Sequence, residues 1–291
     1  MGLGLTGREA FGQEGDAEAV DPPPDIVVER EGEGEHAGED DHGTPHYPLE
    51  KPERIAWSFD GIFGTYDAAQ LQRGFQVYQS SCATCHGLGR VAFRTLAEPT
   101  GPYLSEEAMR AIAAAYQVPD DDTGELRPGR PSDYFPAIAP GAAGFAAVPP
   151  DLSLMAKARG VSPGFPGWLI DGIIPYQEGG ADYIYSLLVG YHAPPEGEEA
   201  PPGLFYNPYF VSGAYIAMPP PLFDGAIPYA DEAIPETVAQ YAEDVAAFLM
   251  WTAEPKLTDR KRIGFQAMIF IAVFATLVFF TKRRVWRGVE H

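Results

Sequence analysis

Both cysteines of the chain lie in one stretch of five residues, Cys82-Ala83-Thr84-Cys85-His86. The spacing C-x-x-C-H is the pattern by which c-type haem is attached to protein. In that chemistry the two thiols add to the two vinyl groups of one haem, and the imidazole that follows reaches the iron from the same turn. We therefore predict one covalently bound haem c at Cys82 and Cys85, with His86 as an axial ligand of the iron.

Two other uses of paired cysteines fit the sequence less well. A redox-active C-x-x-C pair begins a helix in a βαβ setting, but no strand-like apolar run precedes Cys82, and Gly87-Leu88-Gly89-Arg90 follows His86. A structural zinc site needs more ligands than two cysteines. Of the six histidines, three lie in an acidic N-terminal segment that is unsuited to a core: His36, His42 and His46.

A haem iron that transfers electrons while staying closed to small molecules needs a sixth ligand, and a methionine thioether raises its reduction potential. Met218 suits this role because Pro219-Pro220-Pro221 stiffens the backbone directly after it. His192, in Tyr191-His192-Ala193-Pro194, is a rival ligand. The other methionines fall in the N-terminal tail, in expected helices or in an apolar C-terminal run: Met1, Met109, Met155, Met250 and Met268.

Three helices are expected to position these groups. The first, residues 67–79, leads into the cysteines and carries an apolar stripe with helical spacing. The second, residues 105–117, begins at Ser105, a good N-cap. The third, residues 235–250, has Pro235 in its first turn and one apolar face. The apolar positions are Leu71, Phe75 and Tyr78 in the first helix, and Val238, Tyr241, Val245, Phe248 and Leu249 in the third.

Long connections rich in glycine and proline separate these helices, since the chain holds 32 glycines and 29 prolines among its 291 residues. Such a composition favours a loop-rich fold with little regular structure. We predict a mainly α, loop-rich head of the class I c-type cytochrome kind, with a single C-terminal transmembrane helix.

The formal net charge of −21 argues against nucleic-acid binding, which needs a basic surface. A basic protein is the natural partner, because opposite fields speed encounter. Residues 1–45 form an acidic, glycine-rich extension with few large apolar side chains, for which two interpretations stay open: a solvated, disordered tail or an electrostatic lure for a basic electron acceptor. No signal peptide is visible, so we expect a processed N-terminus or release from a longer precursor.

Residues 46–255 are expected to form the haem domain and residues 256–291 the anchor. The run from Ile263 to Phe280 carries no charge, and a bilayer core needs about 20 such residues, so we predict a span at about 263–281. The alternative is a buried helix of a soluble fold. Basic residues flank both ends and orient the span weakly. Haem attachment takes place outside the cytoplasm, so the head is expected in the periplasm and the C-terminus in the cytoplasm of a bacterium, with one pass through the inner membrane.

Several stretches, in this order, resemble the cytochrome c1 family, the haem subunit of the cytochrome bc1 complex, in its alphaproteobacterial type. Between about residues 57 and 287 they include, besides the haem motif, Trp57-Ser58-Phe59-Asp60-Gly61, Arg130-Pro131-Ser132-Asp133-Tyr134-Phe135, Pro149-Pro150-Asp151-Leu152-Ser153, Tyr206-Asn207-Pro208-Tyr209-Phe210 and Met218-Pro219-Pro220-Pro221-Leu222. The resemblance implies a set of haem-binding positions. These are Cys82, Cys85, His86 and Met218, with His86 and Met218 on the iron, and Arg159, Tyr183 and Pro150 around the haem.

By that resemblance, Arg159 pairs with a haem propionate, Tyr183 lies beside the haem, and Pro150 lines its crevice. The chain would take electrons from a Rieske iron–sulfur protein and pass them to cytochrome c, as a subunit of ubiquinol–cytochrome c oxidoreductase. It would stand beside cytochrome b in a dimeric complex of a respiratory or photosynthetic chain, and no side chain would act as an acid or a base. The alternatives are a haem subunit of another membrane oxidase or dehydrogenase, and a haem-based gas sensor.

Overall fold

The computed structural model describes residues 47–120, 122–138, 148–160 and 179–288, and this part of the chain is mainly helical. Its α-helices are α1 (Ala68–Val77), α2 (Glu106–Ala115), α3 (Met155–Ala158), α5 (Gly179–Val189), α6 (Val238–Ala253) and α7 (Leu257–Val285). Shorter turns are η1 (Tyr78–Cys82), η2 (Phe93–Ala97) and η3 (Trp286–Gly288). The mainly α, loop-rich fold expected from the sequence is confirmed. The acidic extension lies outside the described residues, so its two interpretations stay open.

Two short antiparallel sheets were not expected from the sequence. Strand β1 (Gln117–Pro119) pairs with β2 (Leu126–Pro128), and β3 (Phe205–Tyr206) pairs with β4 (Tyr215–Ile216). Strands of two or three residues are too short to show the alternation of apolar and polar residues that marks a strand in sequence. They stiffen two of the long connections.

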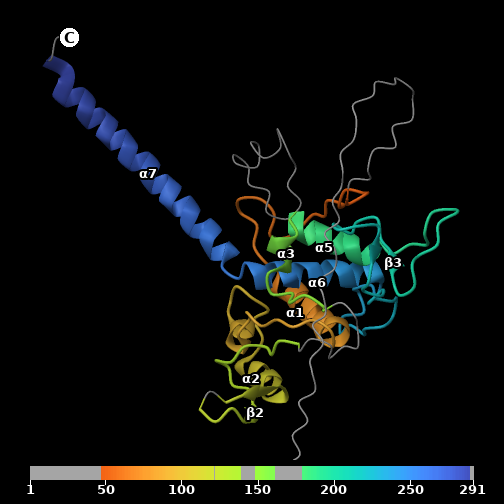
Figure 1. Cartoon of the computed structure of the whole chain (residues 1–291). Helices are drawn as coiled ribbons and strands as arrows, with labels where there is room; N and C mark the ends of the chain where they lie inside the picture. The colour runs from red at the N-terminus through yellow and green to blue at the C-terminus, as the bar shows by residue number, and fades with distance from the viewer. Residues whose placement is uncertain (1–46, 121, 139–147, 161–178, 289–291) are drawn as a thin grey trace, which may run out of the picture. The chain divides into compact units, whose positions relative to one another are not determined.

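Helix α6 lies at the centre of the head, between α1 and α5 (Figure 1). The sequence predicted a single apolar face on this helix. In the structure nearly every residue from Tyr241 to Ala253 is buried, so this stretch is buried on all sides. The expected start was also wrong. The helix begins at Val238, and Thr237 is its N-cap, whose hydroxyl accepts a hydrogen bond from the Gln240 amide at 3.3 Å. Pro235 precedes the helix and takes no place in its first turn.

Helix α1 carries the haem motif at its C-terminal end, and one close contact fixes it on α6. A Cβ atom on Gly74 would lie 2.0 Å from the Asp244 carbonyl oxygen, so only glycine allows the two backbones to approach this closely. Arg73, one residue earlier, donates to both carboxylate oxygens of Asp244, at 3.0 and 2.9 Å. Tyr229 donates to the same carboxylate at 2.7 Å. The start of the haem motif is thereby held against the core.

Helix α2 begins as the sequence predicts. Ser105 is its N-cap and accepts a hydrogen bond from the Ala108 amide at 3.1 Å, while Glu106 and Glu107 occupy the positively charged first turn. The helix ends at Ala115, two residues before the expected end, because β1 starts at Gln117. Met109, expected as a core residue, is buried on the inner face of α2.

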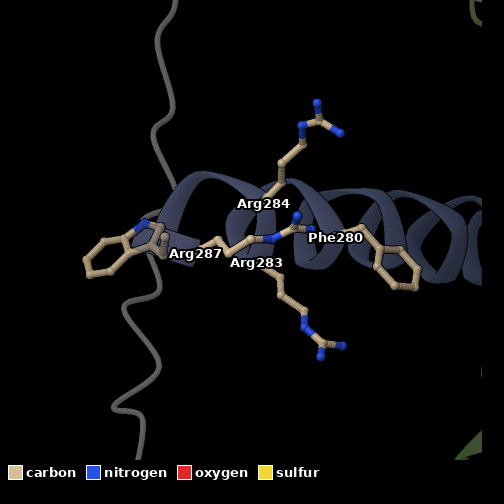
Figure 2. A pocket seen from close by; sticks show the side chains of 5 residues that line it. Phe280, Arg283, Arg284 and Arg287 are labelled. Atoms are coloured by element: carbon tan, nitrogen blue, oxygen red, sulfur yellow. The ribbon is translucent and has the colours of Figure 1, made fainter. Parts of the chain in front are cut away.

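Helix α7 is the one helix of the described residues that is long and apolar enough to cross a membrane. It is longer than the expected span, because a basic turn from Leu257 to Arg262 continues into the apolar run without a break. Its first residue, Leu257, is buried in the head, whereas the side chains from Ile263 onward are exposed. At its other end Arg283, Arg284 and Arg287 project in different directions beyond Phe280 (Figure 2).

Candidate haem-binding site

The two cysteines and His86 share one tight turn after α1. The helix widens into the π-helical turn η1, and the Ala83 amide donates to the Tyr78 carbonyl at 2.8 Å. The Cys82 carbonyl then accepts hydrogen bonds from the amides of Cys85, at 3.0 Å, and His86, at 2.8 Å. Both thiols and the imidazole are therefore carried by a single ordered turn, which is what attachment of one haem by two thioethers and one iron ligand requires.

The His86 ring is held by a backbone carbonyl. Its Nδ1 lies 2.8 Å from the Pro150 oxygen, and since a carbonyl can only accept, Nδ1 donates the hydrogen bond. That tautomer leaves the lone pair of Nε2 available to a metal. Burial lowers the pKa of His86, although the Pro150 bond and the nearby Asp151 oppose the shift. The neutral imidazole that iron binding needs is thus the favoured form.

The segment that supplies the Pro150 carbonyl is tied to the loop after the haem motif. The Asp151 carboxylate accepts from the Gly89 amide at 2.7 Å and from the Ser153 amide at 2.9 Å. The Leu152 amide donates to the Gly87 carbonyl at 2.9 Å. This Asp-x-Ser arrangement is a local turn pattern visible in the sequence, but its partner loop is not, because more than 60 residues separate them.

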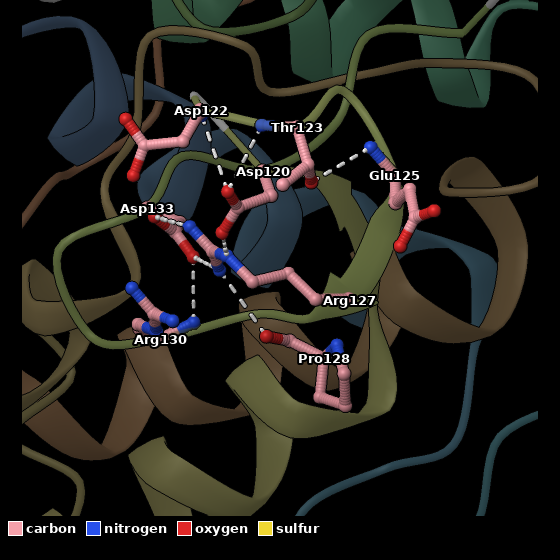
Figure 3. Close-up of polar contacts among 8 residues, drawn as sticks. All are labelled: Asp120, Asp122, Thr123, Glu125, Arg127, Pro128, Arg130 and Asp133. Carbon is pink, nitrogen blue, oxygen red and sulfur yellow. Dashed lines mark hydrogen bonds and ion pairs between the residues drawn. The ribbon is translucent and has the colours of Figure 1, made fainter.

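A third segment packs against the loop that follows the haem motif. The Phe135 amide donates to the Val91 carbonyl at 3.1 Å, and a Cβ atom on Gly87 would lie 3.1 Å from the Pro136 carbonyl oxygen. Arg127 holds this segment in place, because its guanidinium donates to the Asp133 carboxylate at 2.6 and 3.2 Å (Figure 3).

The same guanidinium donates to Asp120 at 2.9 Å, so one arginine joins the turn between β1 and β2 to the segment that follows β2. Arg127 is the largest cause that lowers the pKa of Asp133. Neither Arg127 nor Asp133 was singled out as a functional residue from the sequence, although both lie in or beside a stretch that resembles the family.

Met218 lies in the loop after β4, half-buried, and directly before the prolines. Tyr191 donates its hydroxyl to the Met218 carbonyl at 3.1 Å, which holds the backbone of this loop. Nothing in the sequence signals this contact. His192, the rival ligand, is exposed, and its amide lies 3.5 Å from the Tyr206 carbonyl.

Tyr183 is buried on α5, and its hydroxyl accepts a hydrogen bond from the Val211 amide at 3.4 Å. Burial raises the pKa of Tyr183, while the positive charge of Arg159 lowers it in part. Burial also raises the pKa of Tyr191, with a smaller contribution from Tyr183. The structure therefore brings Arg159, Tyr183, Tyr191 and the Met218 loop into one neighbourhood, and Arg159 itself is exposed at the end of α3.

The sequence-derived site residues thus fall into two sets. His86 and Pro150 are in direct contact beside the two thiols. In the second set the charge of Arg159 acts on Tyr183, and Tyr191 holds the loop of Met218. That both sets face a single haem stays a prediction.

The electrostatics of the cysteines argue against a redox-active pair. Burial raises the pKa of the Cys82 thiol to about 12, and the neighbouring Cys85 adds to the shift. Reactive C-x-x-C pairs have depressed pKa values instead. Together with an imidazole whose Nδ1 is engaged and whose Nε2 remains available, this donor set fits a covalently attached haem.

Comparison with known proteins points the same way. The model of the cytochrome C1 family matches residues 57–289. A protein named cytochrome b/c1 from Bradyrhizobium diazoefficiens is 49% identical over 247 residues, which cover 81% of this chain and 36% of that protein. Cytochrome c1 of Blastochloris viridis is 47% identical over 249 residues, and that of Cereibacter sphaeroides 45% over 261; each match covers 82% of this chain and 88% of the relative.

Proposed function

Because the chain belongs to the cytochrome c1 family, whose members carry one covalently bound haem c, we propose that it is the electron-transfer subunit of a quinol–cytochrome c oxidoreductase. It takes single electrons from a Rieske iron–sulfur protein and passes them to a cytochrome c. The haem supplies a one-electron couple, and the protein sets its potential through the axial ligands and burial. The observation that carries this proposal is the His86–Pro150 hydrogen bond on the cysteine turn.

In this proposal each site residue has one task. Cys82 and Cys85 hold the haem, and the Pro150 carbonyl orients His86 so that Nε2 can bind the iron. Met218 would supply a thioether as the second iron ligand, from a loop whose backbone is held by Tyr191 and by the prolines.

Arg159 and Tyr183 would act at the edge of the haem. A guanidinium matches a propionate in charge and shape, and the positive charge of Arg159 acts on the buried Tyr183. No proton transfer by any of these side chains is needed, because the reaction moves an electron.

The chain would be anchored in the bacterial inner membrane by α7, with residues 46–255 in the periplasm and the C-terminal arginines in the cytoplasm. The uncharged run of α7 supports the membrane span. Haem attachment outside the cytoplasm supports the periplasmic position of the head, because the basic residues at both ends of the span orient it only weakly. Cytochrome b and the Rieske protein would be its partners in the membrane, within a dimeric complex.

Mild detergent extraction of the native membrane, followed by purification through a tag on this chain, tests the proposal. Cytochrome b and the Rieske protein should stay with the chain, and quinol should reduce its haem through the iron–sulfur centre. A chain that purifies with a different set of redox subunits would contradict this assignment.

The net charge of −21 supports a basic cytochrome c as electron acceptor. The rate of cytochrome c reduction should fall as ionic strength rises, because salt screens the attraction. If residues 1–45 act as a lure, their deletion should flatten that dependence, and identical salt curves would favour the solvated-tail interpretation.

A further inference from the structure

The loop that follows Trp57 is folded tightly around two glycines. The Thr65 amide donates to the Ser58 carbonyl at 3.0 Å, which closes the loop at its base. Gly61 has a φ of +65°, a conformation that side chains rarely adopt, and a Cβ atom on Gly64 would lie 2.1 Å from a backbone oxygen of the same loop. The loop therefore has a defined shape.

Between the two glycines stand Ile62 and Phe63, which are 58% and 72% exposed. A single exposed apolar side chain is ordinary on a protein surface. Here two large apolar side chains are adjacent at the tip of a tightly folded loop. This combination indicates a surface that contacts another molecule.

Both sides of this loop are attached to the junction of α6 and α7. On one side the carbonyl of buried Phe59 accepts a hydrogen bond from Lys261 Nζ at 2.6 Å. On the other side the Tyr66 hydroxyl lies 3.1 Å from the Glu254 carbonyl and 3.3 Å from the Met250 carbonyl. The loop is therefore fixed at two points, one at the end of α6 and one on the first turns of α7.

The tip lies at the level of the first apolar turn of α7. The rings of Phe63 and Phe265 meet edge to face, with centroids 5.1 Å apart. Phe265 is the third residue of the uncharged run that begins at Ile263, and the basic residues 260–262 precede that run. In a spanning helix, basic residues lie at the headgroups and the apolar run begins at the edge of the hydrocarbon. Phe63 would share that depth.

We propose that Ile62 and Phe63 form a second membrane contact, inserted into the interfacial region of the outer leaflet beside α7. The partner is the lipid surface itself, because Phe63 packs against Phe265 at the point where the apolar run of α7 begins. Apolar side chains gain from burial at the boundary between headgroups and acyl chains. The contact would add to the anchor a restraint on the tilt of the haem domain. The inference rests on the proposed membrane anchoring by α7.

Photo-cross-linking in native membranes tests this directly. The full chain is made with p-benzoylphenylalanine in place of one residue, at position 63, 270 or 126, and adducts are identified by mass spectrometry after irradiation. The three residues are matched in exposure, at 72% for Phe63, 70% for Phe270 and 69% for Leu126. Phe270 lies inside the apolar run of α7, and Leu126 lies in strand β2 of the head.

We expect lipid adducts from positions 63 and 270, and none from position 126. Adducts from 270 without any from 63 would overturn the loop contact and leave the anchor intact, whereas the absence of lipid adducts from 270 would overturn the anchoring on which the inference rests. An adduct from 63 to another protein alone would show that a neighbouring subunit covers the tip, and would also overturn the proposal.

Discussion

Replacing Arg73 by methionine should strongly destabilise the head, because it leaves a buried carboxylate without its cation. Asp244 is fully buried, and its two oxygens receive both hydrogen bonds of the Arg73 side chain, at 3.0 and 2.9 Å. In the variant Tyr229 is the one side chain among the described residues that still donates to this carboxylate, at 2.7 Å. Methionine keeps most of the length of the side chain, so the change removes charge more than packing.

The expected loss is about 3–5 kcal/mol of the free energy of unfolding, the usual cost of removing one partner from a buried ion pair. Since about 1.4 kcal/mol corresponds to a tenfold change in an equilibrium constant, the unfolding equilibrium constant should rise by about two to four powers of ten. Arg73 is partly exposed, with 20% of its side-chain surface accessible, so water compensates part of the loss and the lower end of the range is expected.

Urea titration of the detergent-solubilised chain at pH 7, followed by haem absorption, measures the loss. Glu243→Gln is the matched control, since Glu243 is a half-buried neighbour on α6 whose carboxylate accepts a hydrogen bond from Gln70 at 3.1 Å. This substitution should cost less than about 1.5 kcal/mol. Adding Asp244→Leu to the Arg73 variant should restore much of the stability. A loss below about 1 kcal/mol in the single variant would refute the reasoning, because surface ion pairs contribute that little.

Three further changes test the neighbourhood of the haem. Gly180→Ala should displace α3, since its Cβ would collide with the Ala156 carbonyl. We expect the free energy of unfolding in urea titrations to fall by at least about 1–3 kcal/mol and the haem potential to change. An unchanged urea midpoint would contradict the close packing. Arg159→Ala should shift the haem potential or impair haem insertion, and a potential equal to that of the parent in redox titration would refute the propionate contact. Arg127→Gln should lower the free energy of unfolding by an amount that depends on pH. Arg127 lowers the pKa of Asp133 in the folded protein, which stabilises the fold at pH values above the ordinary carboxyl pKa of about 3.9. This stabilisation is lost as the pH falls through the lower pKa of the folded state. The stability gap between parent and variant should therefore be full at neutral pH and shrink in acid, and a gap that does not change with pH would contradict it.

Local signals in the sequence predicted the helices that flank the haem motif. Ser105 is the N-cap of α2, as the sequence predicts, and Asp67, the first residue of the expected helix 67–79, is the N-cap of α1. The start of α6 was missed because Pro235 suits a first turn, whereas Thr237 caps the helix two residues later.

The contacts that shape the site could not be predicted, because they join residues far apart in sequence. The Pro150 carbonyl reaches His86 across 64 residues, and the Tyr191 hydroxyl reaches the Met218 carbonyl across 27. A carbonyl has no residue type, so neither acceptor leaves a trace in the sequence. The centrality of α6 was hidden for a similar reason, since burial on all sides depends on which helices pack around it.

The central claim is that His86 and Met218 are the two axial ligands of one haem. Met218→Leu tests it most directly, with Met155→Leu as control, because Met155 is also half-buried and lies in α3. Redox titration and absorption spectra of the purified complex should show a lowered haem potential and loss of the methionine–iron band near the red edge for Met218→Leu, with both unchanged for Met155→Leu. A Met218→Leu variant that keeps the parent potential and the band would show that the sixth ligand lies elsewhere.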